Sequence, residues 1–416
     1  MYVYKAKRLK KRRNFSRVYL NIELFFFLCA LLVNESYLYL FPRGIIYSFT
    51  QDIILLWGIF VYLKFRGDKK RRYRYKNVIL LIVFAQIISI FKANLVNNEP
   101  FIYAFEETRS MFVILLYFPM KVLFDKYGID KIVVIITKFG NFVSILLIIQ
   151  RILYPEIIFL KTETGERFGH YRTYYFMALT IFTLLFNVSK LFKEKISLVT
   201  YISLSVNMIA FIFVQQTKSA IIAVLVSCIV IFILDINKGK LLNKIFFVFL
   251  SFLLIYLTKE YILLLYTEAV ESINEAVLTV TGNIGVRIRL IEFILNSIKN
   301  NYLFGLGYYS GLWSQSIYIT GWAYGYAMGD VGFFSYIFHV GFVGLGFSLY
   351  YLVKLTINVL EINKKSKYSS FGKMIILYFL LISGFNYYFT TNNMLLYLII
   401  YTCIFEKKVE QENCLI

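Results

Sequence analysis

Residues 196–234 read ISLVTYISLSVNMIAFIFVQQTKSAIIAVLVSCIVIFIL and contain a single charged side chain, that of Lys218. Two apolar runs, Ile196–Val214 and Ala220–Leu234, flank the polar turn Gln215–Ser219. A helix that crosses a membrane needs about 20 mainly apolar residues, or fewer when flanking side chains reach the interface. The stretch therefore predicts two membrane-spanning helices joined by a short turn.

The same pattern recurs along the whole chain. The 416 residues are 59% hydrophobic and only 17% charged, which is too apolar for a water-soluble domain. We therefore predict an all-α, polytopic membrane protein with about twelve transmembrane helices, in a single domain over residues 1–416. Residues 259–330 form the one long extracytoplasmic loop. The predicted spans are Val18–Val33, Ile45–Leu63, Asn77–Phe91, Ser110–Phe124, Ile132–Tyr154, Thr173–Ser189, Ile196–Val214, Ala220–Leu234, Ile245–Leu257, Val331–Val353, Met374–Phe389 and Met394–Phe405.

Lysine and arginine residues predict the orientation of these helices. With the N-terminus inside, alternate loops hold 32 of the 45 basic residues, as short cytosolic loops do in membrane proteins. This bias predicts a bacterial cytoplasmic membrane protein with both termini in the cytosol. It also accounts for the net charge of +21, since we interpret the basic runs as topology determinants rather than as sites for anionic lipid or nucleic acid. Membrane lipid is an expected partner of the protein as a whole, and nucleic acid is not.

The segment Gly285–Gly307 reads GVRIRLIEFILNSIKNNYLFGLG and predicts an amphipathic helix in the long loop. Its apolar stripe comprises Ile288, Ile291, Ile294, Leu295 and Ile298, and its polar face comprises Arg289, Glu292, Asn296 and Lys299. Arg287 lies in the middle of the apolar stripe, where a guanidinium is costly unless it meets an anion. We therefore predict that Arg287 binds an anionic group. The alternative is a structural ion pair with Glu106 or Glu107.

Four further residues are candidates for the same extracytoplasmic site. Lys218 begins a helix beside hydroxyl groups, which suits a phosphate oxygen, although interfacial lysines are also common there. Asp330 immediately precedes a span. It is a functional group of the site, the cap of that helix, or both. His170 and Arg172 belong to a charged outer segment, where His170 is either a base or simply solvated. The sequence has no metal-ligand cluster and no cofactor motif, so we expect neither.

The glycine-containing end of this segment resembles a motif of the O-antigen and capsular polysaccharide polymerase family (Wzy-type), which is related to the O-antigen ligases. Asn301–Gly307 reads NYLFGLG and is similar to the Asn-Pro-Leu-Phe-Gly-x-Gly pattern of that family, with Tyr302 in place of proline. Arg287 falls where the family has its arginine. Thr217–Ala220 resembles a Thr-Arg-Ser turn, with Lys218 in place of arginine.

A third element of the resemblance is an aspartate that opens a span carrying Gly-x-x-Gly. Asp330 and the pair Gly341 and Gly344 fit it, and the whole resemblance covers roughly residues 210–350. The departures matter, because Lys218 lacks the bidentate phosphate contact that arginine offers.

The resemblance implies an inverting, metal-independent glycosyltransferase of the membrane-embedded C type. Its donor would be a glycan on undecaprenyl diphosphate, and its acceptor a lipid-linked oligosaccharide repeat unit of capsule, O-antigen or exopolysaccharide. Arg287 and Asp330 would be catalytic, and Lys218, Arg289, His170 and Arg172 would bind substrate. A chain-length regulator and a flippase are the partners that such an enzyme implies. The alternatives are that the protein is itself a flippase or transporter of lipid-linked oligosaccharide, or a ligase-type transferase.

Overall fold

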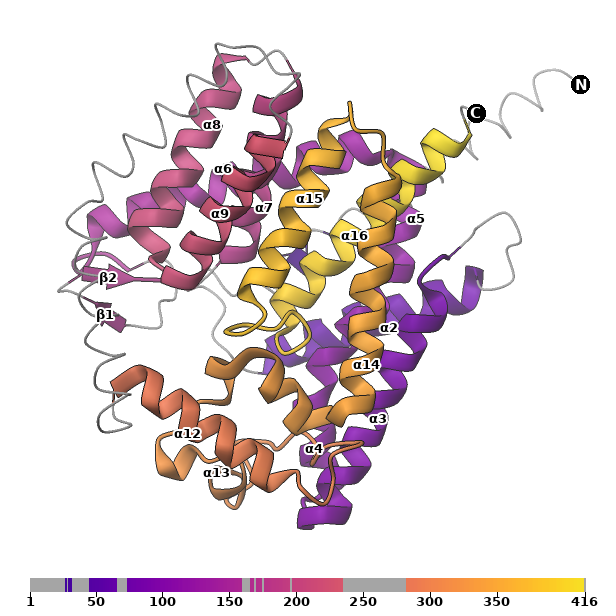
Figure 1. Ribbon diagram of the computed structural model, residues 1–416, viewed down its shortest axis with the longest axis vertical. Helices are drawn as coiled ribbons and strands as arrows, with labels where there is room; N and C mark the ends of the chain where they lie inside the picture. Colours follow the sequence, from indigo (N-terminus) through magenta and orange to yellow (C-terminus); the bar gives the residue numbers. More distant parts are fainter. Residues whose placement is uncertain are drawn as a thin grey trace, which may run out of the picture.

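Helices account for nearly all of the structure, a computed structural model that describes residues 27, 29–31, 45–65, 73–158, 165–167, 170–173, 176–194, 197–234 and 282–414 (Figure 1). The α-helices are α2 (Ile45–Phe65), α3 (Lys76–Asn97), α4 (Phe101–Thr108), α5 (Tyr117–Tyr127), α6 (Ile129–Leu153), α7 (Met177–Lys193), α8 (Leu198–Ile209), α9 (Lys218–Leu234), α12 (Gly282–Ser297), α13 (Ser316–Ile319), α14 (Gly332–Glu361), α15 (Lys367–Ile382) and α16 (Asn392–Asn413). The 3₁₀ helices are η1 (Arg109–Leu116), η4 (Trp322–Tyr324) and η5 (Met328–Val331), and η2 (Ala210–Gln215) is a π-helix that continues α8.

Among the residues that the structure describes, four helical segments are long and apolar enough to cross a membrane, as the sequence predicted for a helical membrane protein. They are Lys76–Asn97, Ile129–Leu153, Leu198–Gln215 and Met328–Glu361. Their surfaces keep large apolar side chains exposed, such as Phe84 at 55% and Ile152 at 74%, which suits contact with lipid. These helices do not establish the predicted number of twelve. The predicted span Ile245–Leu257, and most of Val18–Val33, lie outside the described residues.

The last helix, α16, forms the centre of the molecule. Every residue from Leu395 to Phe405 is buried, and α16 packs against α5, η1, α7 and α14 (Figure 1). Hydropathy alone predicted a short transmembrane span at Met394–Phe405, but protein rather than lipid surrounds most of this run. The helix therefore serves as a core element around which the others pack.

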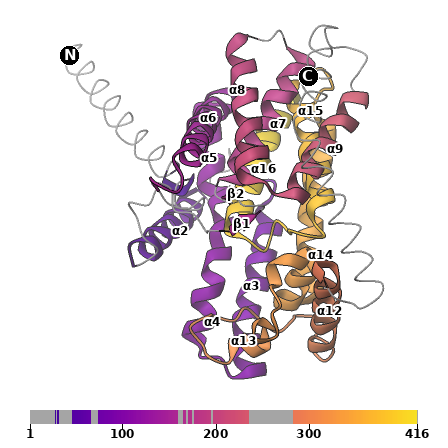
Figure 2. The ribbon, with the colours of Figure 1, turned by 90° about the vertical axis from the view of Figure 1, so that its left-hand side faces the viewer.

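Several segments that the sequence predicts to be cytosolic meet at one end of the helices. Side chains from predicted cytosolic segments pair at one end: Arg74 with Glu361 at 3.3 Å, Lys121 with Glu410 at 2.7 Å, and Lys367 with Glu194 at 3.0 Å. The other end, here called the α12 end, gathers α4, α12 and α13 (Figure 2). There Lys92 Nζ donates a hydrogen bond to Asn301 Oδ1 at 2.7 Å. Which end faces the cytosol stays a prediction.

A small β-hairpin accompanies the helices of this all-α fold. Strands β1 (Gly165–Arg167) and β2 (His170–Arg172) pair antiparallel, with Arg167 opposite His170. Only two residues separate the strands, which is the connection length of a tight hairpin. The amide of Thr173 donates to the carbonyl of Val214 at 3.3 Å, so the hairpin lies beside η2.

Candidate functional site

The candidate site begins at a break in helix α14. Gly341 has φ 69° and ψ −173°, so the helix is interrupted there and nearby main-chain groups lose their helical partners. The segment Tyr302–Gly307 replaces those partners. Four main-chain hydrogen bonds join the two: Leu306 N to Phe338 O at 2.8 Å, Gly307 N to His339 O at 3.1 Å, Phe342 N to Tyr302 O at 2.9 Å, and Val343 N to Leu303 O at 3.0 Å. The glycine-rich segment of the long loop is therefore docked into the broken helix.

Glycine is required in this segment for two reasons. Gly305 and Gly307 have φ of 67° and 104°, backbone angles that residues with a side chain rarely adopt. A Cβ on Gly307 would also lie 2.6 Å from the carbonyl oxygen of Ser89 on α3. His339 completes the contact, since its Nδ1 lies 2.9 Å from the carbonyl oxygen of Gly307 and its ring stacks on Tyr308 at 4.1 Å. His339 is therefore a structural residue of the docked segment.

Helix α12 leads into this segment and is amphipathic, but its boundaries and apolar face differ from the prediction. The helix ends at Ser297, and turns follow it, rather than a helix to Gly307. The predicted polar face of Arg289, Glu292, Asn296 and Lys299 lies exposed. The buried apolar residues of this region are Leu290 and Ile294 of α12 and Ile298 just after the helix. They belong to the cluster that also contains Val331 and Phe338. Ile288 and Leu295 are 42% and 44% exposed, because the neighbours of α12 cover a narrower and shifted stripe.

Arg287 is half-buried at the start of α12. Its guanidinium carbon lies 5.4 Å from the centroid of the Phe385 ring, a cation–π contact. In the part of the chain that the structure describes, no carboxylate pairs with Arg287. Arg287 forms no ion pair with Glu106 or Glu107, the two carboxylates of the alternative; Glu106 lies 3.8 Å from Arg109 instead. The guanidinium of Arg287 thus lies on an aromatic ring, and none of the described carboxylates compensates its charge.

Asp330 lies on η5, against which α12 packs, and its side chain is exposed. The prediction that Asp330 caps the following helix is wrong. Helix α14 begins at Gly332, its N-cap residue is Val331, and no side chain caps it. The amide of Phe333 instead donates to the carbonyl of Ser383 at 3.1 Å. Arg287 contacts the loop after α15 through Phe385, and Phe333, three residues after Asp330, contacts the same loop through Ser383.

Lys218 is the first residue of α9 and is half-buried. Helix α9 packs along α15, the helix that precedes Phe385, so α9 and α12 contact neighbouring parts of the chain. The hairpin that carries His170 and Arg172 adjoins η2, just before this lysine. The side chains of His170 and Arg172 lie outside the part of the structure that is described.

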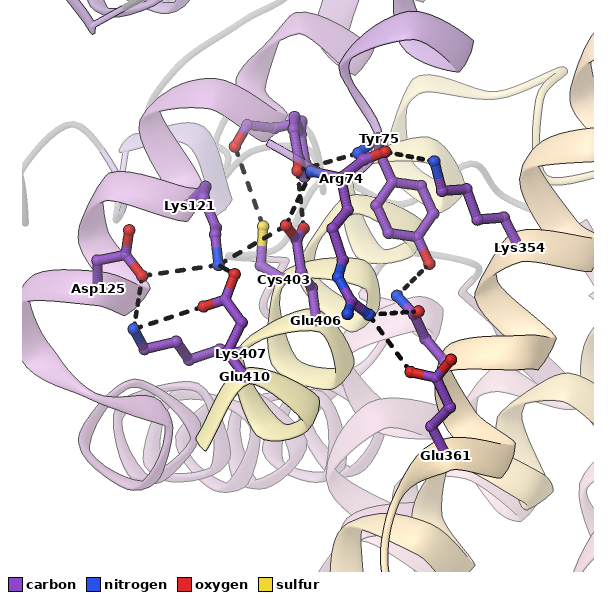
Figure 3. Close-up of polar contacts among 12 residues, drawn as sticks. Arg74, Tyr75, Lys121, Asp125, Lys354, Glu361, Cys403, Glu406, Lys407 and Glu410 are labelled. Atoms are coloured by element: carbon purple, nitrogen blue, oxygen red, sulfur yellow. Dashed lines mark hydrogen bonds and ion pairs between the residues drawn. The ribbon is translucent and has the colours of Figure 1, made fainter. Parts of the chain in front are cut away.

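Sequence reasoning missed a buried ionic network at the opposite end of the molecule (Figure 3). Glu406 on α16 is fully buried, and its two oxygens accept hydrogen bonds from the amide of Arg74 at 3.0 Å and the hydroxyl of Tyr117 at 2.7 Å. Lys121, 1% exposed, lies 3.7 Å from Glu406 and 2.7 Å from Glu410. Further pairs extend the network: Lys407 with Asp125 at 2.7 Å, Arg74 with Glu361 at 3.3 Å, and Lys354 with the Arg74 carbonyl.

The network holds helices together rather than offering a binding site. Its members come from the turn just before α3, from α5, from the second half of α14 and from α16 (Figure 3). The buried cation Lys121 and the buried anion Glu406 already satisfy one another and accept or donate further hydrogen bonds. Removing one charge of such a buried pair leaves the other charge uncompensated, which destabilises the folded protein.

Glu99 is a second residue that the sequence did not single out. It lies in the turn between α3 and α4, is fully buried, and accepts a hydrogen bond from the amide of Ser310 through Oε1 at 2.8 Å. Burial raises the pKa of the Glu99 carboxyl to about 7, against the opposing effect of the Ser310 amide. The carboxyl therefore ties the docked loop to α3 through a group that titrates near neutral pH.

The fold and these contacts define a helical membrane protein whose long loop docks into a broken helix and presents Arg287 beside Phe385. Comparison with known proteins assigns it to no family, since no family model and no curated protein matches the chain. Among the described residues, no three or more His, Cys, Asp or Glu side chains lie together as a metal site would require.

Proposed function

We propose that the protein polymerises lipid-linked oligosaccharide repeat units at the α12 end, on the outer side of a bacterial cytoplasmic membrane, with both termini in the cytosol. The donor is a glycan linked to undecaprenyl diphosphate, and the acceptor is a single lipid-linked repeat unit. The enzyme is then an inverting glycosyltransferase that needs no metal. Its product serves as capsule, O-antigen or exopolysaccharide.

The reaction breaks one bond and forms one bond at the anomeric carbon of the donor. An acceptor hydroxyl attacks that carbon from the face opposite the diphosphate, and the bond to the diphosphate oxygen breaks with both electrons staying on that oxygen. Asp330 orients the hydroxyl and accepts its proton. Arg287 stabilises the negative charge that grows on the departing lipid diphosphate, and Lys218 assists. Arg289, His170 and Arg172 bind other parts of the substrate.

The observation that carries this proposal is the environment of Arg287. An arginine that serves only structure in a partly buried position normally faces a carboxylate, because an unpaired buried charge is costly. Arg287 has an aromatic ring beneath it and no carboxylate partner among the described residues. A phosphate group, like a carboxylate, can accept two parallel hydrogen bonds from a guanidinium, one on each of two oxygens.

Support also comes from the way α12 is held. A cation contributes to a transition state only if it is already in place, because reorganisation during the reaction reduces the benefit. Helix α12 is fixed by Leu290, Ile294 and Ile298 on one side and by the docked glycine segment that follows it. The position of Arg287 is therefore set before any substrate arrives.

A strain that lacks the gene tests the proposal through the length of its surface glycan. Loss of a polymerase leaves single repeat units at the cell surface. Loss of a flippase or transporter leaves almost no repeat unit there, and loss of a ligase leaves polymer that is made but not attached. Either of the last two results would replace the proposed activity by the corresponding alternative.

A further inference from the structure

The docked segment lies beside the second half of α3, a helix long and apolar enough to cross the membrane. At 1.5 Å per residue the span Lys76–Asn97 is about 33 Å long, close to the thickness of the hydrocarbon core. A Cβ on Gly307 would lie 2.6 Å from the carbonyl oxygen of Ser89, about 12 Å inside the far end of this span. A Cβ on Gly344, just after the break in α14, would lie 3.7 Å from the Cβ of Ala85, about one turn deeper.

The chain enters and leaves this position from the same end of α3. On the way in, Asn301 Oδ1 accepts a hydrogen bond from Lys92 Nζ at 2.7 Å. On the way out, the amide of Ser310 donates to Glu99 Oε1 at 2.8 Å. Both contacts lie nearer the α12 end than the contact of Gly307 does. In two perpendicular views α12 and α13 lie at the level of α3 rather than beyond its end (Figure 1, Figure 2).

The main chain of the docked segment is paired at this depth. Irregular backbone can lie within a membrane only where protein satisfies its polar groups. The break in α14 does so, because two carbonyls of the segment accept hydrogen bonds from the second half of α14 and two of its amides donate to the first half. Within the loop, the amide of Gly305 donates to the carbonyl of Asn301 at 2.8 Å.

The side chains at the start of the segment are exposed and apolar. Tyr302 and Leu303 are 54% and 48% exposed, and the Tyr302 carbonyl accepts a hydrogen bond from the amide of Phe342. Phe342, Leu349 and Val353 are also exposed and share one face of α14 at 100° per residue. Because α14 belongs to a candidate membrane span, this face suits contact with lipid. The exposed surface of the docked segment continues it.

Composition also favours lipid over water around this part of the loop. Residues 300–329 contain no aspartate, glutamate, lysine, arginine or histidine. About a quarter of the residues of a typical soluble domain are charged, so an exposed stretch of this length in water would carry several charges. Trp322 and Tyr324 are exposed in the same stretch, and these residue types are enriched where a membrane meets water.

We propose that the docked segment is a re-entrant membrane segment, whose Tyr302 and Leu303 side chains contact the acyl chains of the leaflet at the α12 end. Part of the loop that the sequence predicts to be extracytoplasmic then lies within the bilayer, and α12 with Arg287 is tethered beside the membrane surface. The inference is independent of the reaction that the protein catalyses, since it rests on the depth, pairing and exposure of this segment.

Tryptophan fluorescence in vesicles tests this contact. Leu303→Trp and Tyr302→Trp are each introduced into the full-length protein carrying Trp57→Phe, Trp313→Phe and Trp322→Phe, so that each variant has one tryptophan. Each is reconstituted in vesicles of phosphatidylethanolamine and phosphatidylglycerol, with and without lipids brominated on their acyl chains. Bromine quenches tryptophan that touches the chains, and iodide in the buffer quenches tryptophan in water.

Two further single-tryptophan variants calibrate the measurement. Phe84→Trp lies on the exposed apolar face of α3 and reports contact with lipid. Lys364→Trp lies in the exposed turn after α14 and reports contact with water. Only variants that unfold at the temperature of the tryptophan-free background are compared. Tyr302→Trp keeps an aromatic ring at an exposed position and serves as the conservative second site.

The proposal predicts that both test positions lose emission to brominated lipid as strongly as Phe84→Trp does, and lose little to iodide. Strong quenching by iodide with weak quenching by brominated lipid would overturn it, because the segment would then face water or an aqueous substrate cleft. Quenching by neither agent would also overturn it, because protein would then cover these side chains.

Discussion

Gly305 and Gly341 meet backbone to backbone across the break in α14. A Cβ built on Gly305 would lie 2.7 Å from the amide nitrogen of Gly341, and a Cβ built on Gly341 would lie 2.5 Å from the amide nitrogen of Gly305. Both residues also have positive φ, so a side chain is strained at either position before any contact is considered. This contact places the long loop, and with it α12, against the rest of the molecule.

Adding a single methyl group at this contact should therefore undock the loop. We expect Gly341→Ala and Gly305→Ala each to destabilise the protein by about 3 kcal/mol or more, from backbone strain together with the steric clash. Thermal unfolding and the rate of proteolytic cleavage within Tyr302–Gly307 measure the effect. Gly346→Ala is the matched control in the same helix, because nothing lies within 4 Å of its Cβ position and its φ is ordinary. Equal behaviour of Gly341→Ala and this control would contradict the docking contact.

Breaking the buried ion pair at the opposite end should be costly, and removing both charges should cost less than the sum. We expect Lys121→Met to destabilise the protein by about 3–5 kcal/mol, since it leaves the fully buried Glu406 without its cation. In Lys121→Met with Glu406→Leu, the two losses should not add, because neither charge is then left alone. Thermal unfolding in detergent measures both.

Lys408→Ala, which alters an i,i+4 pair with Glu412, is the control and should shift stability by about 0.5 kcal/mol or less. Additive losses would argue that the pair is not coupled.

Glu99 should make the stability of the protein depend on pH. Because burial raises the pKa of the Glu99 carboxyl in the folded protein to about 7 from its ordinary 4.5, folding favours the protonated form. Its stabilising contribution is complete below pH 4.5 and is lost as the pH rises through 7. We therefore expect Glu99→Gln to gain thermal stability relative to the wild type between pH 5 and pH 8.5. A difference in unfolding temperature that stays constant over this range would show that the carboxyl does not titrate there.

Helix phase allowed part of the site to be anticipated from the sequence. At 100° per residue, Arg287 and Arg289 lie on different faces of a helix. In the structure Arg287 is half-buried and Arg289 is exposed. The same reasoning misjudged the stripe itself, since Ile288 and Leu295 are exposed. Phase shows which residues share a face, but only tertiary packing determines how wide a face the neighbouring elements cover.

Other features depend on contacts that no local pattern records. Hydropathy found the apolar run in α16 but could not distinguish a helix surrounded by lipid from one surrounded by protein. Glu406 and Lys121 lie far apart in the chain, so their pairing emerges only from packing. Asp330 has the residue type of a helix cap, yet Gly332 has φ 47° and the helix begins there with Val331 as its N-cap residue. A broken helix at Gly341 had no sequence signal beyond the glycine itself.

The central claim is that Arg287 acts on a lipid diphosphate during glycan polymerisation. The direct measurement is reconstitution of the purified protein with a lipid-linked repeat unit, followed by separation of the products by length. We predict a ladder of products for the wild type and for Glu292→Ala, a control variant on the exposed face of the same helix. Arg287→Ala should lose about 100-fold or more in rate, as expected for one group that stabilises a developing charge, and Arg287→Lys should recover part of it. A full ladder from stably folded Arg287→Ala would contradict the assignment of Arg287, and the absence of any ladder from the wild type would contradict the proposed activity.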